Sequence, residues 1–556
     1  MTSSLLNTPF PRWSLDKVLC ERIALTPDRT FVQFEGDPAH SFADMYEMAL
    51  RYAARLKHEG VGRNDRVAMF AGNSAEHIAL WFAINLLGAI DAPINPALRG
   101  RTLEHAVNLV EPKLLVAEAE LLPVLARDGL DLGRLNTVLW FGPLSERLPE
   151  LAGVTLAHLD SSSSTELLSA DSLPSLAPSD TASILFTSGT TGPSKGVMVT
   201  HAQAFLTARQ TVEGLWVGAD DVYYCAHPLF HMSPRFCVVY ATLLTGAAIC
   251  FDRKFAADRW IDRIRECGAT ITIGHGPLIE MIYQQPERSD DAQTKLTRLG
   301  TSPFPRHIAL DFERRFGLKG IETWGMTEIN IPCWHPPGEP LRVGSAGKIR
   351  QEWYDFQVID SESDLPLPTG EVGEFVIRPK LPWIVTPGYF RNAEATVKTQ
   401  RNFWFHTGDS GYVDADGWVY FVDRLGDRIR RRAENISSYD IEVAANAHPA
   451  VLESAAVGVP SGYSSDDDVK LCVVMQSGAA IAPAELLSYL AGELPHHMVP
   501  RYIEYLDELP RTPTQKVRKA ELRTSGVTTS TWDRKENSVA LRTLIADGAA
   551  GGVAKD

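Results

Sequence analysis

Short apolar segments alternate with longer segments of helical periodicity along the first half of the chain. Glu76–Gly88 is strongly apolar and long enough for a helix, and short apolar runs precede and follow it. Strands that alternate with helices predict a parallel α/β sheet. The segments predicted to be its strands are Arg66–Phe70, Ile90–Pro93, Leu114–Ala117, Thr137–Leu139 and Thr270–Ile273.

The pattern changes in the second half of the chain. Val343–Val422 is rich in short strand-like segments separated by turns, which predicts a small β subdomain. A smaller α/β pattern follows it and continues to about residue 525. Ser464–Asp468 is predicted to be a solvated acidic loop. The tail after Ser525 is predicted to be flexible, with a short helical piece at Val539–Ile545.

Length, charge and cysteine content narrow the class of protein. A chain of 556 residues exceeds one hydrophobic core and should form at least two domains. The net charge of −15 argues against nucleic acid or an anionic membrane as the main partner. Seven cysteines without a CxxC pair predict reduced thiols in a cytoplasmic protein. We expect neither a signal peptide nor a membrane span, because the N-terminus lacks the required pattern and no apolar run is long enough.

A polar loop with one lysine, Thr187–Gly196, follows the apolar strand end Ile184–Phe186. Its glycines allow backbone N–H groups to approach an anion closely, its hydroxyls donate hydrogen bonds, and Lys195 supplies charge. The loop does not fit the P-loop pattern, because Ser194 and Gly196 stand where a glycine and a Ser/Thr are required. A strand at Val197–Val199 and a helix capped by Thr200 and Gln203 are predicted to follow.

Further motifs occur downstream in a fixed order. They are Trp324–Glu328 (WGMTE), His406–Asp409 (HTGD), Asp423–Arg424 and Pro510–Lys516 (PRTPTQK). Together with the polar loop, this series resembles the adenylate-forming superfamily, which includes acyl-CoA synthetases, adenylation domains of peptide synthetases and firefly luciferase. The resemblance runs from about residue 15 to residue 523.

The resemblance implies an α/β fold class with two domains that move relative to each other. The large N-terminal domain, residues 1–424, would consist of layered α/β sheets and a small β-barrel-like subdomain at about 343–422. A hinge would lie at 425–426, a small mobile C-terminal α+β domain at 427–525, and the tail at 526–556. Gly426 departs from the Asp or Lys that the superfamily usually has at the hinge, and glycine permits the backbone rotation at little steric cost.

The same resemblance implies a site for ATP and Mg²⁺. Trp324 stands where a tyrosine usually covers the adenine, and Asp409 with Arg424 would bind the ribose. Thr327 would donate to the α-phosphate, and Glu328 would hold Mg²⁺, a hard cation that prefers oxygen ligands. The residues matched to nucleotide-binding positions are Thr187, Ser188, Gly189, Thr190, Thr191, Gly192, Lys195, Gly300, Thr301, Ser302, Trp324, Gly325, Met326, Asp409 and Arg424.

Two histidines four residues apart, His227 and His231, could suggest a metal pair on a helix. Pro228 opposes the helix, and no third ligand is apparent, so a zinc site is not expected. The resemblance instead places His231 near the substrate carboxylate. Peptide-synthetase domains usually have an aspartate there, so its absence argues against an α-amino acid. The predicted substrate pocket, which favours a hydrophobic or bulky acid, consists of Phe230, His231, Met232, Phe236, Gly274, His275, Gly276 and Trp324.

Two departures from the superfamily affect the predicted second domain. Ala433 stands where a glycine is expected at the wall of the coenzyme A (CoA) tunnel, which leaves the thioester step open. The arginines at 428, 430, 431 and 432 form either a solvated face or a grip on the CoA phosphates. The CoA loop matched by similarity is Arg432, Ala433, Glu434 and Asn435, and Lys516 is matched to the catalytic lysine.

Three functional hypotheses follow from the sequence. The first is an acyl-CoA ligase, which would use ATP, Mg²⁺, CoA and a small carboxylic acid. The Glu434–Ser437 segment resembles that branch, including carnitine-CoA-ligase-like enzymes. The second is an acyl-AMP ligase that loads a separate carrier protein, and the third is a non-catalytic nucleotide-binding protein. Either a monomer or a homodimer is compatible with the sequence.

Overall fold

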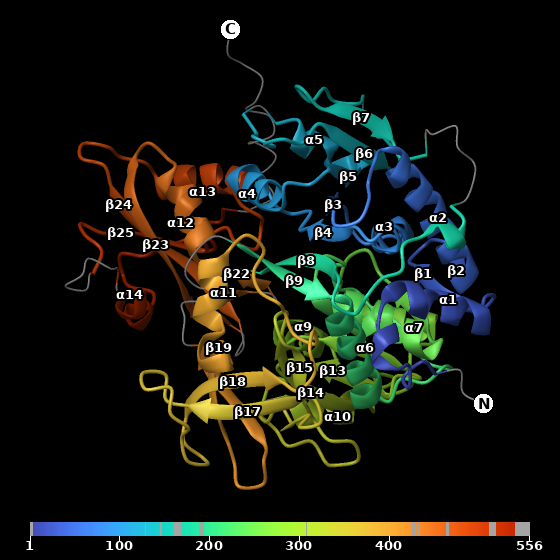
Figure 1. The fold of residues 1–556 in the computed structure, drawn as a ribbon. Helices are drawn as coiled ribbons and strands as arrows, with labels where there is room; N and C mark the ends of the chain where they lie inside the picture. The colour runs from blue at the N-terminus through green and yellow to red at the C-terminus, as the bar shows by residue number, and fades with distance from the viewer. Residues whose placement is uncertain are drawn as a thin grey trace.

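Two large sheets and one small domain form the protein (Figure 1). The computed structural model describes residues 4–127, 129–144, 147–160, 168–187, 194–306, 308–424, 429–431, 434–436, 438–462, 466–510, 517 and 519–539. The fold is the predicted α/β class, and the predicted strands of the first half of the chain are confirmed. Each of them ends within two residues of its predicted limits, because buried β-branched and aliphatic runs leave few alternatives.

The first sheet has seven strands in the order β7-β6-β5-β3-β4-β8-β9. All neighbouring pairs are parallel except β8 with β9, whose antiparallel pairing carries the chain through the polar loop. The strands are β3 (Arg66–Phe70), β4 (Ile90–Ile94), β5 (Leu114–Glu118), β6 (Thr137–Phe141), β7 (Thr155–His158), β8 (Thr181–Thr187) and β9 (Lys195–Thr200).

The second sheet has nine strands in the order β16-β15-β14-β13-β12-β10-β11-β1-β2. Its six central strands are parallel, and antiparallel strands occupy both edges. The strands are β1 (Thr30–Phe34), β2 (Ala39–Ser41), β10 (Val222–Cys225), β11 (Ala248–Phe251), β12 (Ile271–Gly274), β13 (Arg298–Thr301), β14 (Lys319–Met326), β15 (Asn330–Trp334) and β16 (Lys348–Ile349).

Two helices lie between these sheets. Every residue of α3 (Ala75–Leu86) except Glu76 is buried, and the helix contacts β4 of the first sheet and β1 of the second. The other, α6 (His201–Leu215), contacts β8 and β9 on one side and β13 and β15 on the other. A helix that is apolar on all sides is stable only when it is covered on all sides, so α3 holds the two sheets together.

The remaining helices of the large domain lie around this sandwich. They are α1 (Leu15–Leu25), α2 (Phe42–His58), α4 (Gly100–Val110), α5 (Leu122–Leu125), α7 (Ala241–Thr245), α8 (Trp260–Cys267), α9 (Gly276–Tyr283), α10 (Ala309–Phe316) and α11 (Ala393–Thr399), with a π-helix at Ser233–Tyr240. An antiparallel four-stranded sheet follows, formed by β17 (Tyr354–Ile359), β18 (Gly373–Pro379), β19 (Phe405–Val413) and β20 (Val419–Arg424).

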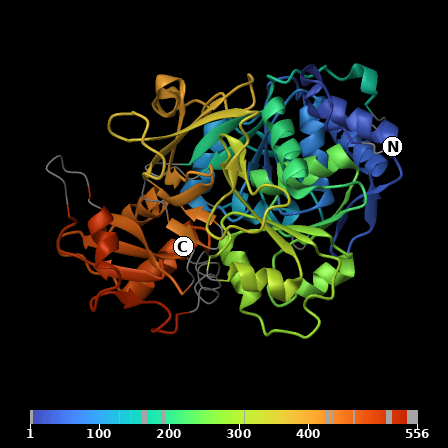
Figure 2. The same cartoon turned by 90° about the horizontal axis from the view of Figure 1, so that it is seen from below.

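The small domain has its own hydrophobic core and lies beside the large one, with α13 next to α4 (Figures 1 and 2). Arg127 joins the two domains, because its guanidinium donates to the Gly492 carbonyl at 2.6 Å and pairs with Glu493 at 2.7 Å. The elements are β21 (Ile429–Arg431), β22 (Glu434–Ile436), α12 (Ser438–Asn446), β23 (Val451–Pro460), β24 (Asp467–Met475), α13 (Pro483–Glu493), β25 (Tyr502–Tyr505), α14 (Lys519–Ser525) and β26 (Trp532–Asp533).

Two sequence predictions for this domain are wrong in part. Asp468 is not solvated: it lies buried on β24 and pairs with Arg501 at 2.7 Å. The tail is ordered as far as β26, which pairs with β25 while Asp533 binds Arg501 at 2.7 Å. Both errors arise because Arg501 attracts two distant aspartates, a contact that local composition does not reveal. Of the predicted helical piece at 539–545, only Val539 belongs to the described residues, and it is not helical.

The prediction of reduced thiols is wrong for one pair of cysteines. Cys250 at the end of β11 and Cys267 at the end of α8 form a disulfide, with a Cα–Cα distance of 6.2 Å. The other five cysteines are free. A spacing of 17 residues does not predict a disulfide, because the two cysteines come together only where α8 packs back against the sheet.

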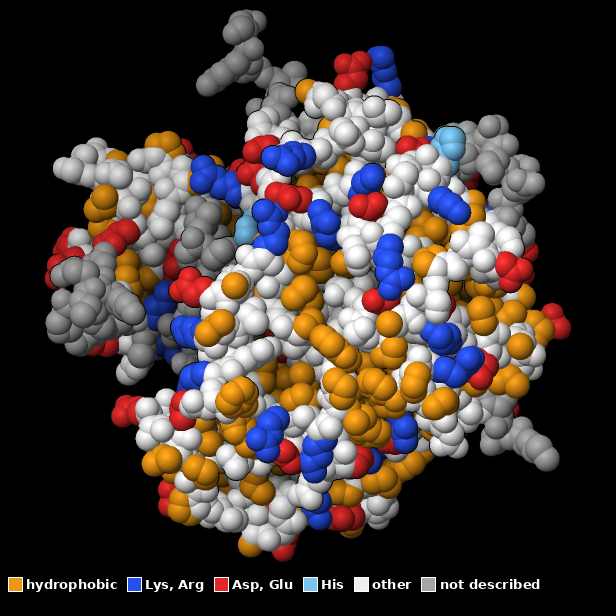
Figure 3. All heavy atoms as spheres, in the orientation of Figure 1, with side chains coloured by type: hydrophobic (Ala, Val, Ile, Leu, Met, Phe, Trp, Pro, Cys, Tyr) orange, Lys and Arg blue, Asp and Glu red, His pale blue; other side chains and the backbone are white. Residues whose placement is uncertain are grey.

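The surface carries charges of both signs. On the face shown in Figure 3, basic and acidic side chains are interspersed, and hydrophobic side chains gather over its middle. Among the helices that the structure describes, none has the length and apolar composition needed to cross a bilayer.

Two buried histidines make stability depend on pH. Burial lowers the pKa of His77 to about 3 and that of His201 to about 4. Because the unfolded chain binds these protons with a pKa of about 6.5, the stability that these two histidines contribute falls as pH falls below that value. The loss is about 1.4 kcal/mol per pH unit for each histidine.

The buried carboxyls of Asp91, Glu322 and Asp440, whose pKa values burial raises, act in the opposite direction, so the histidine contribution is measured by comparing variants. The substitution His201→Gln should make the thermal unfolding midpoint at pH 5, relative to pH 7, higher than in the parent, because it removes one of the two histidines that destabilise the fold at low pH. A variant whose midpoint changes with pH as steeply as the parent would contradict the assignment.

Candidate active site

A cavity of about 300 Å³ lies where the ends of β8, β12 and β14 meet the small domain. Its walls come from the base of the polar loop, from the 227–234 loop, from the turn after β14 and from the start of α12. The predicted site residues that line it are Thr187, Phe230, His231, Met232, His275, Gly325, Met326, Thr327 and Glu328. The structure thus brings together residues of the segments that the sequence predicts to bind phosphate, metal and acid.

Other predicted site residues lie elsewhere. Phe236 belongs to the π-helix and packs edge-on against Trp81 in the core, so it does not line the cavity. A Cβ atom on Gly274 would meet Ile279 at 3.1 Å, so this glycine faces the core. Gly276 begins α9, and Gly300 to Ser302 end β13 and its turn.

Several predicted residues cannot be placed. Arg424, Glu434 and Asn435 are described only as parts of β20 and β22. Those outside the described residues are Ser188, Gly189, Thr190, Thr191, Gly192, Gly426, Arg432, Ala433 and Lys516. Their roles therefore stay predictions.

Asn73 holds the loop that contains His231, and sequence reasoning missed it. Its side-chain amide donates to the carbonyl oxygens of His227 at 3.1 Å and Asp252 at 3.2 Å, and its oxygen accepts from the Leu229 N–H at 2.8 Å. The side chain is buried, so these bonds satisfy polar groups that would otherwise be left unpaired in the core. No local pattern identifies such a residue, because its partners are more than 150 positions away.

A buried ion pair anchors the other side of this loop. Arg235, in the π-helix, pairs with Asp91 of β4, and both side chains are fully buried. The guanidinium also donates to the Leu229 carbonyl at 3.3 Å and lies over the Trp81 ring at 4.1 Å. Ser183 of β8 donates to the same carboxylate at 3.4 Å. The pair therefore connects the histidine loop to the strand that leads into the polar loop.

The free-energy cost of removing this ion pair from water is seen in the pKa of Asp91. Burial raises the pKa of Asp91 to about 6, although Arg235 and Ser183 oppose the rise. Desolvation therefore outweighs attraction for the carboxylate, as is common for ion pairs in a protein core.

Thr327 and Glu328 are fixed from two directions. Gln203 donates to the Thr327 carbonyl at 2.8 Å, and the Tyr389 hydroxyl donates to the Glu328 carboxylate at 2.9 Å. The Lys195 ammonium lies 4.7 Å from the centre of the Tyr389 ring. Lys195 and Glu328 thus share one aromatic neighbour, although they are distant in sequence.

These contacts decide two sequence predictions. The Thr200 hydroxyl caps α6 by accepting from the Gln203 N–H at 3.1 Å, as predicted. The Gln203 side chain does not complete a capping box, because the turn after β14 uses its amide. The Glu328 carboxylate fits Mg²⁺, which takes oxygen ligands and usually one or two carboxylates together with substrate phosphates. Among the described residues, no cluster of three His, Cys, Asp or Glu offers a metal site without substrate.

Trp324 and Asp409 are bonded to each other. The indole N–H donates to the Asp409 carboxylate at 2.9 Å, and both side chains are buried. The edges of Phe356 and Phe375 pack against the indole at centroid distances of 6.1 and 5.2 Å. In this arrangement Trp324 holds the carboxylate matched to ribose binding, and neither residue lines the cavity. Its stacking on adenine stays a prediction.

The small domain closes one side of the cavity through Ile436, Asp440, His497 and Met498. Burial raises the pKa of Asp440 to about 7. Arg431 is buried and donates to the carbonyl oxygens of His497 at 3.1 Å and Val499 at 2.7 Å. The two alternatives predicted for the arginine cluster are a solvated face and a grip on the CoA phosphates. Neither holds for Arg431, because its guanidinium binds the loop beside the cavity.

Comparisons with known proteins agree with this geometry. The AMP-binding enzyme family model matches residues 19–390, and the AMP-binding enzyme C-terminal domain model matches residues 440–516. The crotonobetaine/carnitine–CoA ligase of Salmonella agona (strain SL483) is 31% identical over 508 residues, which cover 89% of this chain and 96% of that protein.

Two solved structures share the fold. The o-succinylbenzoate CoA synthetase double mutant from Bacillus subtilis has a TM-score of 0.77 at 22% identity, covering 94% of this chain and 99% of that one. The ATP-bound MatB from Rhodopseudomonas palustris has a TM-score of 0.65 at 25% identity, with the same coverage of 94% and 99%.

The Arg235–Asp91 pair makes a prediction about stability. Asp91→Ala leaves the guanidinium buried without its carboxylate and should lower the free energy of unfolding by about 3–5 kcal/mol. The double variant Asp91→Leu, Arg235→Met removes both charges and should lose clearly less in denaturant unfolding. An equal loss in both variants would show that packing, and not charge, determines the effect.

Proposed function

The chain belongs to the AMP-binding enzyme family, and we propose that it is an AMP-forming ligase that joins a carboxylic acid to CoA at the expense of ATP. One observation carries the proposal. Residues of the segments matched to acid binding and to phosphate and metal binding line a single cavity, which the small domain closes on one side. Family membership weighs against the non-catalytic alternative.

The first step activates the acid. A carboxylate oxygen attacks the α-phosphorus of ATP, an acyl-AMP anhydride forms, and pyrophosphate leaves. Because two anions must approach each other, the protein acts mainly by positioning them and by placing positive charge and N–H or O–H donors around the phosphates. His231 orients the acid, Thr327 donates to the α-phosphate, and Lys195 and the polar loop bind the departing pyrophosphate. Glu328 would hold Mg²⁺, which screens the phosphate charge.

The second step forms the thioester. The CoA sulfur attacks the acyl carbon, the carbon–oxygen bond to AMP breaks, AMP leaves with the bonding electrons, and the thiol proton passes to solvent or buffer. In the orientation observed, the start of α12 and the 497–498 loop face the cavity, where the pantetheine arm would enter. Lys516 acts in the first step. Rotation of the small domain about the segment at Gly426 then replaces the face that carries Lys516 by the face that carries the CoA loop.

The acid lacks an α-ammonium group, because His231 stands where an aspartate would pair with one. Apolar side chains at Phe230, Met232 and Met326 contribute to the cavity and suit a hydrophobic portion of the substrate. A second acyl acceptor is favoured by one position of the sequence, because Ala433 stands where the family is expected to have a glycine at the pantetheine tunnel. In that version of the reaction, a separate carrier protein supplies the thiol.

Pyrophosphate release over a panel of carboxylic acids, measured with and without CoA, tests the function. We expect release to depend on the acid, and AMP and a CoA thioester to form together when CoA is present. Release without consumption of CoA would favour the carrier protein as acceptor. No release with any acid would contradict the proposed activity.

The variant Lys516→Ala tests the division of labour between the two steps. We expect adenylation to slow by about 10²–10⁴-fold, because the lysine charge would be lost from the transition state. Conversion of supplied acyl-AMP and CoA to thioester should continue near the parental rate. Equal loss of both half-reactions, measured separately by quench-flow, would refute this assignment.

A further inference from the structure

His227, His231 and His275 are three of the histidines that line the cavity. The rings of His227 and His275 stack with their centres 4.2 Å apart and their planes at 29°. The ring centre of His231 lies 4.1 Å from that of Phe230. All four side chains line the cavity, although only His231 matches a motif of the family. The paired rings of His227 and His275 are therefore a feature of this chain that its family membership leaves unexplained.

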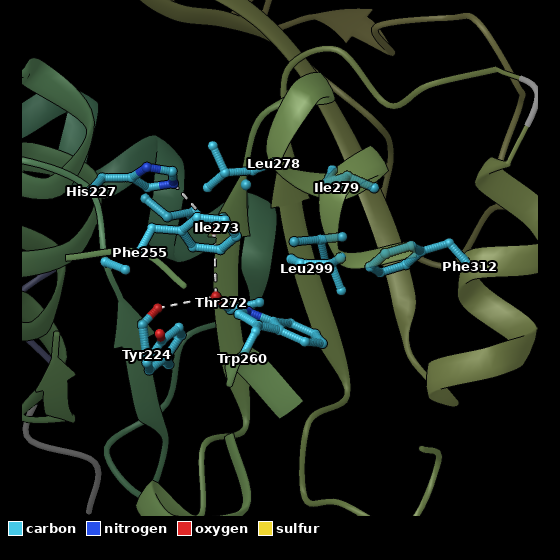
Figure 4. A pocket seen from close by; sticks show the side chains of 13 residues that line it. Tyr224, His227, Phe255, Trp260, Thr272, Ile273, Leu278, Ile279, Leu299 and Phe312 are labelled. Carbon is cyan, nitrogen blue, oxygen red and sulfur yellow. Dashed lines mark hydrogen bonds between the residues drawn. The ribbon is translucent and has the colours of Figure 1, made fainter. Parts of the chain in front are cut away.

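The position of His227 is fixed on both sides. Its Nε2 atom lies 3.2 Å from the Ile273 carbonyl oxygen, as Figure 4 shows, so the ring donates this proton to the end of β12. Its own carbonyl is held by Asn73 at 3.1 Å. His275 directly precedes α9, and its carbonyl accepts from the Ile279 N–H at 3.0 Å. Both rings thus sit on anchored backbone and can meet a ligand without reorganisation.

The chemistry of the cavity wall at these histidines suits an oxygen anion. Because Nε2–H of His227 already donates to the Ile273 carbonyl, this ring would donate to a carboxylate through Nδ1 in its protonated form, and such charge-assisted hydrogen bonds are about twice as strong as neutral ones. Two stacked imidazoles accept a proton more readily when an anion lies beside them, because it offsets the repulsion between them. The N-terminal end of α9, which carries partial positive charge, adds to this preference.

A quaternary ammonium group fits less well. Such cations are recognised by aromatic faces and by carboxylates. Among the described residues that line the cavity, Phe186 and Phe230 have carbocyclic rings, and the two acidic residues, Glu328 and Asp440, belong to the turn after β14 and to α12 rather than to the histidine segments. The cavity lining therefore suits poorly the quaternary ammonium group of the acids after which its crotonobetaine/carnitine–CoA ligase relatives are named.

We propose that the substrate is a dicarboxylic acid, whose second carboxylate binds the His227–His275 pair while the first is adenylated beside His231. This inference rests on the proposed ligase function and specifies its substrate class. His227 and His275 are specificity-determining residues, because they bind a part of the acid that does not react.

A small apolar void behind His227 provides a second test. It measures about 10 Å³, and Ile279, Leu299 and Phe312 contribute to its walls (Figure 4). His227 lines both this void and the main cavity, so its ring stands between them. His227→Leu would replace the polar partition by an apolar one and should favour acids with an apolar end.

The experiment compares acids that differ only at the far end. The kcat/KM for pyrophosphate release is measured for α,ω-dicarboxylic acids of increasing length, for their monomethyl esters and for the matching monocarboxylic acids. We expect the best diacid to exceed its monoester by about tenfold or more, as loss of a hydrogen bond to a charged group implies. This measurement requires no variant.

Two variants then test the residues. His275→Phe and His227→Leu should each reduce the ratio of diacid to monoester by about tenfold, and His227→Leu should also raise the kcat/KM for monocarboxylic acids. His448→Phe, the same kind of change on the small domain beside Tyr489, is the matched control and should preserve the ratio. Thermal midpoints establish that each variant is folded.

The outcomes separate this inference from the proposed function. If no acid supports pyrophosphate release, the ligase function itself fails. If monoesters or monocarboxylic acids are used as well as the diacids, the function stands and the dicarboxylate inference is overturned. If the preference for diacids survives in both histidine variants, the assignment of the second carboxylate to this pair is overturned.

Discussion

The buried pair of Arg235 and Asp91 links the parts of the cavity to one another. Asp91 lies on β4 and also accepts from Ser183 of β8, whereas Arg235 reaches the Leu229 carbonyl in the loop of His231. A displaced guanidinium would leave charge unpaired in the core, where that is costly, so the pair tolerates few alternative positions. The ion pair consequently fixes the position of the acid-binding loop relative to the strand that leads to the phosphate loop.

Much of the fold was predictable because local signals and tertiary structure agree. Arg66–Phe70 is apolar at successive positions and becomes β3, and Thr200 begins α6 as a side-chain cap. The loop and turn motifs could be placed because a cavity at the carboxyl ends of parallel strands is where an α/β sheet binds ligands. The part of the site that depends on backbone and motif was therefore accessible from sequence.

The rest depended on contacts between distant segments. Asn73 and Gln203 hold the site, yet each looks like an ordinary polar residue beside a helix N-terminus. Phe236 was expected in the pocket because it follows His231 closely, but the π-helix turns its ring toward Trp81 in the core. The sequence around His227 suggests only a metal pair with His231, because its stacking partner His275 lies at another strand end. No local periodicity encodes which loops face each other.

Because the small domain provides part of the cavity wall, the way out for a finished product runs past that domain. Ile436, Asp440, His497 and Met498 would have to withdraw before a bulky thioester could escape. The contacts of Arg127 with Gly492 and Glu493 join the small domain to the large one in the orientation observed. At saturating substrate, kcat would then depend on how often the contact between the two domains opens. Ionic strength and viscosity should therefore change kcat even when the chemical steps are fast.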